Sequence, residues 1–185
     1  MFATSINKTL RFVVLDVLNG SKHSLALWVY LLLVIGHFSE HVAQLYQVII
    51  LGWTSREAGG LLGLQFSGLA EAELLHTAYN SFQLTGLLVL AFGFEKSKIA
   101  RRWWFVALIM QSWHWLEHVL LQVQYLTGYY LFNAEKQTSL LEWFFPRIEL
   151  HFVYNLLVFI PTILAISIYS SATTKLWRTL KLKEN

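Results

Sequence analysis

The chain has 185 residues, of which 56% are hydrophobic and only 14% are charged, and its mean hydropathy is +0.48. A typical soluble domain is about 25% charged, so the composition argues against a water-soluble globular protein. Because the chain has no cysteine, disulfides, thiolate metal sites, iron–sulfur clusters and cysteine nucleophiles are excluded. Two prolines and ten glycines exclude a collagen-like or disordered chain, and the length suits one domain.

Four apolar stretches are each long enough to cross a bilayer, which takes roughly 20 helical residues. They cover approximately residues 24–51, 71–94, 103–128 and 147–170. A shorter stretch at residues 6–18 mixes apolar and charged residues, which predicts a helix lying in the membrane interface. We therefore expect an all-α integral membrane protein with four transmembrane helices and an N-terminal interfacial amphipathic helix.

The basic residues predict the orientation of these spans, because lysine and arginine accumulate on the cytoplasmic side of membrane proteins. Eleven of the fourteen basic residues precede the first span, join the second to the third, or follow the fourth: Lys8, Arg11, Lys22, Lys96, Lys98, Arg101, Arg102, Lys175, Arg178, Lys181 and Lys183. Both termini are thus expected in the cytoplasm and loops 52–70 and 129–146 outside, in the plasma (inner) membrane. The positive charge then indicates lipid headgroups as partners, and no nucleic acid.

Two polar motifs alternate along the four spans, in the order His-x-x-Glu-His, Leu-His-x-x-Tyr-Asn, and the same again. The first begins at His37 and recurs 77 residues later at His114; its second histidines are His41 and His118. The histidines of the second motif, His76 and His151, are 75 residues apart. Two different motifs recurring in one order indicate a tandem duplication.

The expected repeat unit is a two-helix hairpin, at residues 24–95 and again at 96–171. Each unit contains an even number of spans, so the two halves have the same orientation and are related by a pseudo-twofold axis along the membrane normal. An N-terminal interfacial helix, 1–23, precedes them, and a basic cytoplasmic tail, 172–185, follows.

The duplicated motifs contain six of the seven histidines, and such residues inside a bilayer usually face the bundle interior. Positions i, i+3 and i+4 share one helix face, so each His-x-x-Glu-His motif points three side chains the same way. Carboxylate di-metal bundles use a similar design, and imidazole suits iron, copper or zinc. The sequence therefore predicts two transition-metal ions, each with three histidines and one glutamate, drawn from His37, Glu40, His41, His76, His114, Glu117, His118 and His151.

Further polar residues recur with the expected ligands. A ligating histidine normally donates its second N–H to a polar partner. The residues that recur at suitable positions are Gln47, Gln124, Tyr79, Tyr154, Asn80 and Asn155. Capping and hydrogen bonding between helices explain the tyrosines and asparagines equally well.

The ligand inventory is similar to that of the integral-membrane hydroxylases and desaturases, although their histidine boxes have other spacings and face the cytoplasm. We expect an iron or copper oxidoreductase acting on a lipid-soluble small molecule, with Glu40 and Glu117 as catalytic groups that bridge the metals or carry protons. Four alternatives stay open: a haem- or chlorin-binding subunit with histidine axial ligands, a zinc-dependent enzyme, a metal transporter and a purely structural subunit. A second copy of the chain or an electron-transfer protein is a further expected partner.

Overall fold

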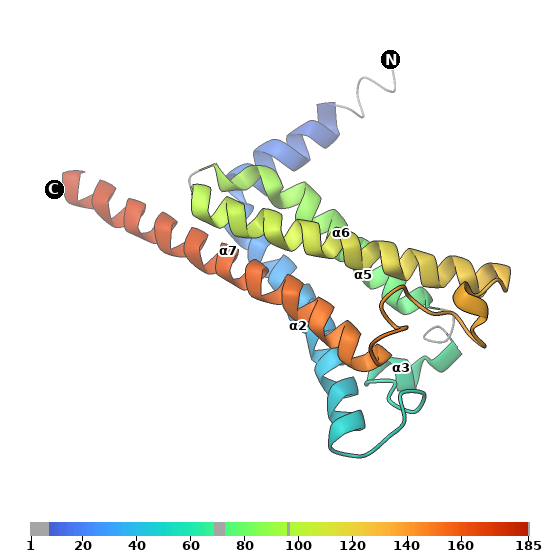
Figure 1. Cartoon of the computed structure of the whole chain (residues 1–185). Helices are drawn as coiled ribbons and strands as arrows, with labels where there is room; N and C mark the ends of the chain where they lie inside the picture. Colours follow the sequence, from blue (N-terminus) through green and yellow to red (C-terminus); the bar gives the residue numbers. More distant parts are fainter. Residues whose placement is uncertain (1–7, 69–72, 96, 185) are drawn as a thin grey trace.

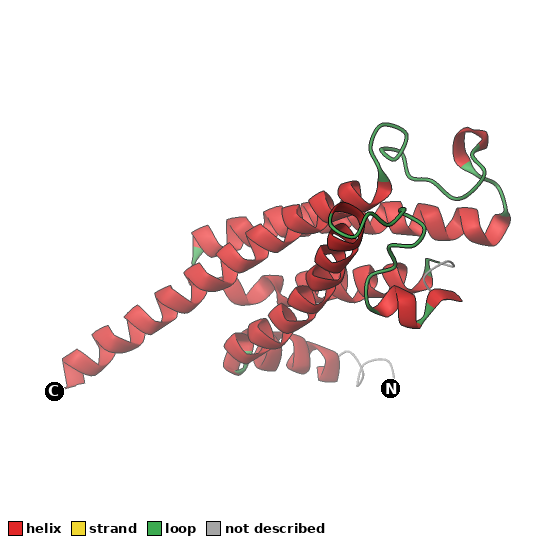
Figure 2. Ribbon diagram, turned by 90° about the horizontal axis from the view of Figure 1, so that it is seen from below, coloured by secondary structure: helices red, strands yellow, loops and turns green. Residues whose placement is uncertain are grey.

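The computed structural model describes residues 8–68, 73–95 and 97–184, with side chains as far as Thr174. Within these residues every regular element is a helix, which confirms the all-α class (Figures 1 and 2). The long helices are α2 (His23–Ile49), α5 (Leu74–Leu90), α6 (Lys98–Thr127) and α7 (Arg147–Glu184). The short ones are η1 (Phe12–Ser21), α3 (Leu62–Gln65), η2 (Ala91–Phe94) and η3 (Leu131–Asn133).

The long helices coincide with the four apolar stretches, with one extension. Helix α7 continues through the expected cytoplasmic tail to Glu184, because residues 162–184 contain neither glycine nor proline to end it. Its C-terminal part extends beyond the rest of the bundle in both views (Figures 1 and 2). Residues 1–7 of the expected interfacial segment, residues 71–72 of the second expected span, Lys96, and the basic side chains from Lys175 onward lie outside the part described.

Two helices in the described residues are long and apolar enough to cross a membrane, His23–Ile49 and Arg147–Thr174. Helix α5 has only 17 residues, and histidine, glutamine and arginine interrupt the apolar run of α6, so these two helices do not meet the same requirement. The chain can therefore associate with a membrane through α2 and α7. A crossing by all four helices stays a prediction.

The four long helices pack in the cyclic order α5, α6, α7, α2. Helix α6 packs most extensively against α7, the pairs α5–α6 and α2–α7 pack to a similar extent, and α2 and α5 contact each other least. The loop after α2 and the loop after α6 lie at one end of the bundle, and the short α5–α6 connection lies at the other (Figures 1 and 2). We call these the loop end and the connection end.

The connection end has an apolar core. Trp104 is fully buried there, and its indole N–H donates to the carbonyl oxygen of Leu87 at 2.8 Å. His23, the one histidine outside the motifs, packs edge-on against Phe94 and Tyr169 with ring centroids 5.1 and 5.0 Å away. The polar residues of the motifs lie in the other half of the bundle, towards the loop end.

Gly86 allows α5 to approach α2 at this core. A Cβ atom there would lie 2.5 Å from the ring of Tyr30, whose hydroxyl donates to the carbonyl oxygen of Gln83. We expect Gly86→Ala to destabilise the fold by about 1–3 kcal/mol through overpacking. Gly36→Ala in α2 is the matched control, because a Cβ there meets nothing within 4 Å and alanine favours the helix. Unfolding in detergent should shift in opposite directions for the two variants; equal shifts would contradict the packing argument.

Candidate metal centre

The six motif histidines gather in one cluster at the loop end of the bundle. Five of them are at most 4% exposed, and the side chain of His76 is 20% exposed. Helical periodicity explains the gathering: each motif histidine lies on the helix face that packs against the other helices, and the cluster continues the apolar core towards the loops.

One histidine from each long helix contributes to the centre of this cluster. The ring centroids of His41 and His76 are 5.7 Å apart, and those of His76 and His118 are 5.4 Å apart with parallel planes. His118 and His151 follow at 5.0 Å, and His151 and His41 close the circuit at 6.4 Å. We call these four residues the histidine quartet.

The remaining two histidines flank the quartet in matching ways. His37 lies 4.8 Å from His41, and His114 lies 4.6 Å from His118, in both cases nearly edge-on. Tyr79 packs on His37 at 4.9 Å and Tyr154 on His114 at 5.2 Å. Each hairpin thus presents three histidines and one tyrosine in a similar arrangement.

The histidine rings are short of hydrogen-bond partners. Buried polar groups in proteins are nearly always hydrogen-bonded, and an unsatisfied one costs about 1–3 kcal/mol. Yet within the described residues each of the six rings has at least one buried nitrogen that makes no hydrogen bond: His37 Nε2, His76 Nδ1, His114 Nδ1, both nitrogens of His118, His151 Nε2, and one nitrogen of His41, whose ring also has Gln44 as a partner. So many unsatisfied nitrogens in one place are unusual in a packed protein interior.

The asparagines of the motifs lie against this cluster. Asn80 and Asn155 each donate to the backbone carbonyl four residues earlier, of His76 and His151, at 2.9 Å. The amide of Asn155 also lies 3.3 Å from Nε2 of His114, whereas the Oδ1 of Asn80 accepts from Gln111 at 2.8 Å. One of the two asparagines therefore contacts a histidine ring.

The motif glutamines hold the outer loops. Gln47 accepts from the backbone N–H of Gly60 at 2.8 Å and donates to its carbonyl at 3.2 Å. Gln124 accepts from the N–H of Leu131 at 2.9 Å and donates to the carbonyl of Thr138 at 2.9 Å. Loop 50–61 is further ordered where Glu57 accepts from the N–H and hydroxyl of Thr54, which lowers the pKa of that carboxyl. The glutamines thus cover the cluster by anchoring the chain above it.

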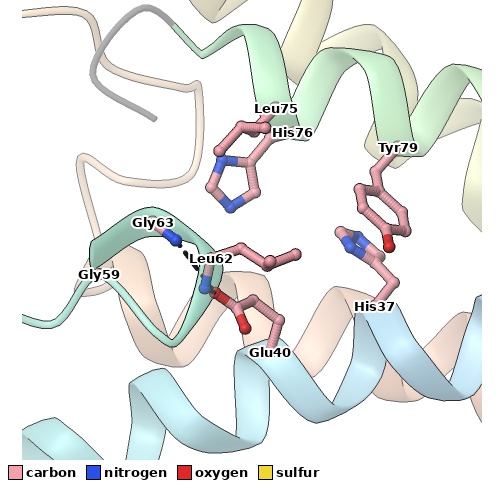
Figure 3. Close-up of a pocket in the computed structure, with 8 residues that line it drawn as sticks. All are labelled: His37, Glu40, Gly59, Leu62, Gly63, Leu75, His76 and Tyr79. Carbon is pink, nitrogen blue, oxygen red and sulfur yellow. Dashed lines mark hydrogen bonds between the residues drawn. The ribbon is translucent and has the colours of Figure 1, made fainter. Parts of the chain in front are cut away.

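The two motif glutamates have different surroundings. Glu40 accepts from the backbone N–H groups of Leu62 and Gly63, at 2.6 and 3.3 Å, where the chain enters α3 (Figure 3). It faces a pocket that His37, His76 and Tyr79 also line. Glu117 is 2% exposed, and its carboxylate has the hydroxyl groups of Tyr154 and Ser139 as hydrogen-bond partners.

Three charged residues outside the motifs complete the site. Glu73, 4% exposed, lies with its Oε2 atom 3.6 Å from Nδ1 of His118 and 3.9 Å from Nδ1 of His76. Its Oε1 atom pairs with Arg147, whose Nε lies 3.3 Å from Oε1 of Glu142. Glu142 in turn is 4.0 Å from Nδ1 of His151. Glu73 could have been recognised from the sequence, because it precedes His76 by three residues, which corresponds to about one helical turn.

A small cavity lies between the quartet and this charged group. It has a volume of about 30 Å³ and is lined by all four quartet histidines together with Glu73 and Arg147. A water molecule needs at least about 10–15 Å³ by this measure, so the cavity has room for a water or one small ion.

No match to a protein-family model, a curated protein or a solved structure was found for this chain. Among residues 8–68, 73–95 and 97–174, whose side chains the structure describes, no three histidine, aspartate or glutamate side chains are already arranged so that they could hold a metal ion. The rings are close together, but their nitrogens do not converge on one point.

Proposed function

We propose that the chain is an integral membrane metalloprotein whose histidine cluster binds two transition-metal ions. The observation that supports this most strongly is that all six motif histidines have buried nitrogens without partners and lie in one contiguous group. A metal ion satisfies several such nitrogens at once. Structural hydrogen bonding, the simplest alternative, leaves them unsatisfied.

The spacing of the rings supports three histidines per ion. Two imidazoles bound tetrahedrally at about 2.0–2.1 Å have ring centroids about 5 Å apart. The centroids of His114, His118 and His151 are 4.6, 5.0 and 5.6 Å apart. Those of His41 lie 4.8 Å from His37 and 5.7 Å from His76.

The matching geometry of the two hairpins favours the tandem duplication. The pairs His37–Tyr79 and His114–Tyr154, and the two asparagine bonds, have nearly equal distances in both halves. We further propose that all four long helices cross the membrane, with both termini cytoplasmic and the histidine cluster towards the outer face. Among the polar residues of α6, His114, Glu117 and His118 are buried, as polar residues of spanning helices usually are, whereas Arg101 and Arg102 near its N-terminus are exposed.

The proposed chemistry is redox or oxygen chemistry on a lipid-soluble molecule, since nitrogen-rich sites suit iron and copper. The pocket beside His37 and His76 has apolar walls in Leu62 and Leu75 and lies between α2 and α5, the adjacent helices with least contact (Figure 3). It is a suitable approach for an apolar molecule. Glu117, buried beside the hydroxyl groups of Tyr154 and Ser139, is suited to carry a proton.

A haem or chlorin at the quartet is less favoured by the geometry. Pockets for ligands of drug size or larger measure about 300–1,000 Å³, whereas the cavity beside the quartet measures about 30 Å³. A transporter is less favoured because the connection end is filled by an apolar core, which offers ions no polar path.

Elemental analysis of the detergent-purified protein, with an absorption spectrum, tests the proposal. We expect about two equivalents of iron or copper per chain, as the two three-histidine sets imply, and no Soret band. Zinc at the same stoichiometry would retain the site and remove the redox chemistry. A Soret band would replace the proposal with a haem protein, and absence of metal after metal-replete expression would refute it.

A further inference from the structure

We infer that Glu73 is a carboxylate ligand of this centre, at the junction between the two hairpins. The inference rests on the proposed metal-binding function and assigns a ligand that neither motif contains. Glu73 precedes α5 in a left-handed conformation, with φ of 58°, which non-glycine residues rarely adopt and which often marks functional sites.

The two carboxylate oxygens of Glu73 have different partners. Arg147 holds Oε1, whereas Oε2 is buried and accepts no hydrogen bond from the part of the chain described. That free oxygen points between His118 and His76, at 3.6 and 3.9 Å from their Nδ1 atoms. These two rings are the parallel pair that joins the hairpins. His118 belongs to one proposed ligand set and His76 to the other, so an ion in either set would gain one carboxylate oxygen beside its histidine nitrogens.

The other carboxylates are less suited to this position. Glu40 already accepts hydrogen bonds from the N–H groups of Leu62 and Gly63. The Oε1 atom of Glu142 lies closer to Arg147, at 3.3 Å, than to Nδ1 of His151, at 4.0 Å. The formal charges also favour a cation, since Glu73, Glu142 and Arg147 together sum to one net negative charge beside the histidine quartet. Buried charge of one sign is costly unless a counter-ion compensates it, and a bound metal supplies that positive charge.

The ion pair with Arg147 provides a control that separates coordination from packing. If Glu73 serves only the ion pair, then Glu73→Gln and Arg147→Met, which both break it, should change metal binding alike. If Glu73 is a ligand, their effects differ in direction: Glu73→Gln removes the anionic oxygen, whereas Arg147→Met removes a cation that competes for it. Glu135→Gln, an exposed carboxylate on the same side of the bundle, controls for the loss of charge alone.

The experiment is a titration of the metal-free, detergent-purified full chain with Co²⁺, followed by visible d–d absorption. We expect Glu73→Gln to lower the affinity for at least one equivalent of Co²⁺ tenfold or more and to alter the d–d spectrum of that equivalent. Arg147→Met and Glu135→Gln should bind Co²⁺ as tightly as the unmodified chain or more tightly. Unchanged binding and spectrum in Glu73→Gln would overturn the assignment alone. Failure of the unmodified chain to bind Co²⁺ would overturn the proposed function as well.

Folding of the variants is followed by far-ultraviolet circular dichroism. If Glu73→Gln does not fold, Glu73→Asp keeps the charge and withdraws the oxygen by one methylene group. If Glu73 is a ligand, Glu73→Asp should bind one equivalent of Co²⁺ more weakly and with a shifted d–d spectrum. A wild-type titration curve and spectrum for Glu73→Asp, together with weaker binding in Arg147→Met, would indicate that the ion pair alone matters.

Discussion

Replacing His41 and His118 together by alanine is expected to abolish metal binding. Each ring is 1% exposed, contacts three other rings of the cluster, and has a buried nitrogen that makes no hydrogen bond within the described residues. Loss of a mere hydrogen-bond partner of a ligand costs about 10–100-fold in metal affinity, so the loss of one ligand from each set should cost more than about 100-fold. The measurement is metal per chain after purification, compared with the unmodified protein.

His23→Ala is the matched control for this double variant. His23 is equally buried but lies at the connection end, against Phe94 and Tyr169. Its replacement leaves a cavity and should lower stability, yet metal content should remain unchanged. A double variant at positions 41 and 118 that folds and retains its full metal content would refute the proposed ligand set.

Trp104→Ala is expected to have the largest effect on folding. The side chain is fully buried against Tyr30 of α2 and Phe94 of η2, and its loss also leaves the carbonyl of Leu87 without the indole donor. Removing a buried tryptophan costs about 3–5 kcal/mol through the cavity it leaves and the contacts it loses. Denaturant or thermal unfolding in detergent, followed by circular dichroism, gives the change in the free energy of unfolding.

The neighbouring tryptophan supplies the comparison. Trp103 is 37% exposed on the outer surface of the same helix, so Trp103→Ala should cost less than about 1 kcal/mol. Equal destabilisation by the two substitutions would show that the connection-end core does not dominate stability.

The sequence was sufficient to predict the four long helices and the face on which their histidines meet. Apolar runs near 20 residues set the positions of the helices, and the spacing of His37, Glu40 and His41 set a common direction. The number of membrane crossings was harder to derive, because the polar residues that build the cluster also lower the hydropathy of α6. Composition alone cannot distinguish a polar residue that faces the bundle interior from one that faces lipid.

The loop contributions to the site could not be predicted. Glu73 and Arg147 are 74 residues apart in the chain, and their pairing depends on how the two hairpins dock. The engagement of Glu40 by Leu62 and Gly63 depends on the path of the loop before α3, which no motif encodes. The motifs place Gln47 and Gln124 beside histidine rings, but their hydrogen bonds go to the loop backbone. This difference also follows from loop paths that no motif encodes.

X-ray absorption spectroscopy of the metal-loaded protein in detergent would test the histidine centre most directly. We expect a first shell dominated by about three nitrogens per ion near 2.0–2.1 Å, with the outer-shell scattering of imidazole rings and at most one or two oxygens. The nitrogen first shell and the imidazole scattering should both disappear in the variant lacking His41 and His118. A first shell of oxygen alone, without imidazole scattering, would contradict the proposal that the buried histidine cluster is a metal centre.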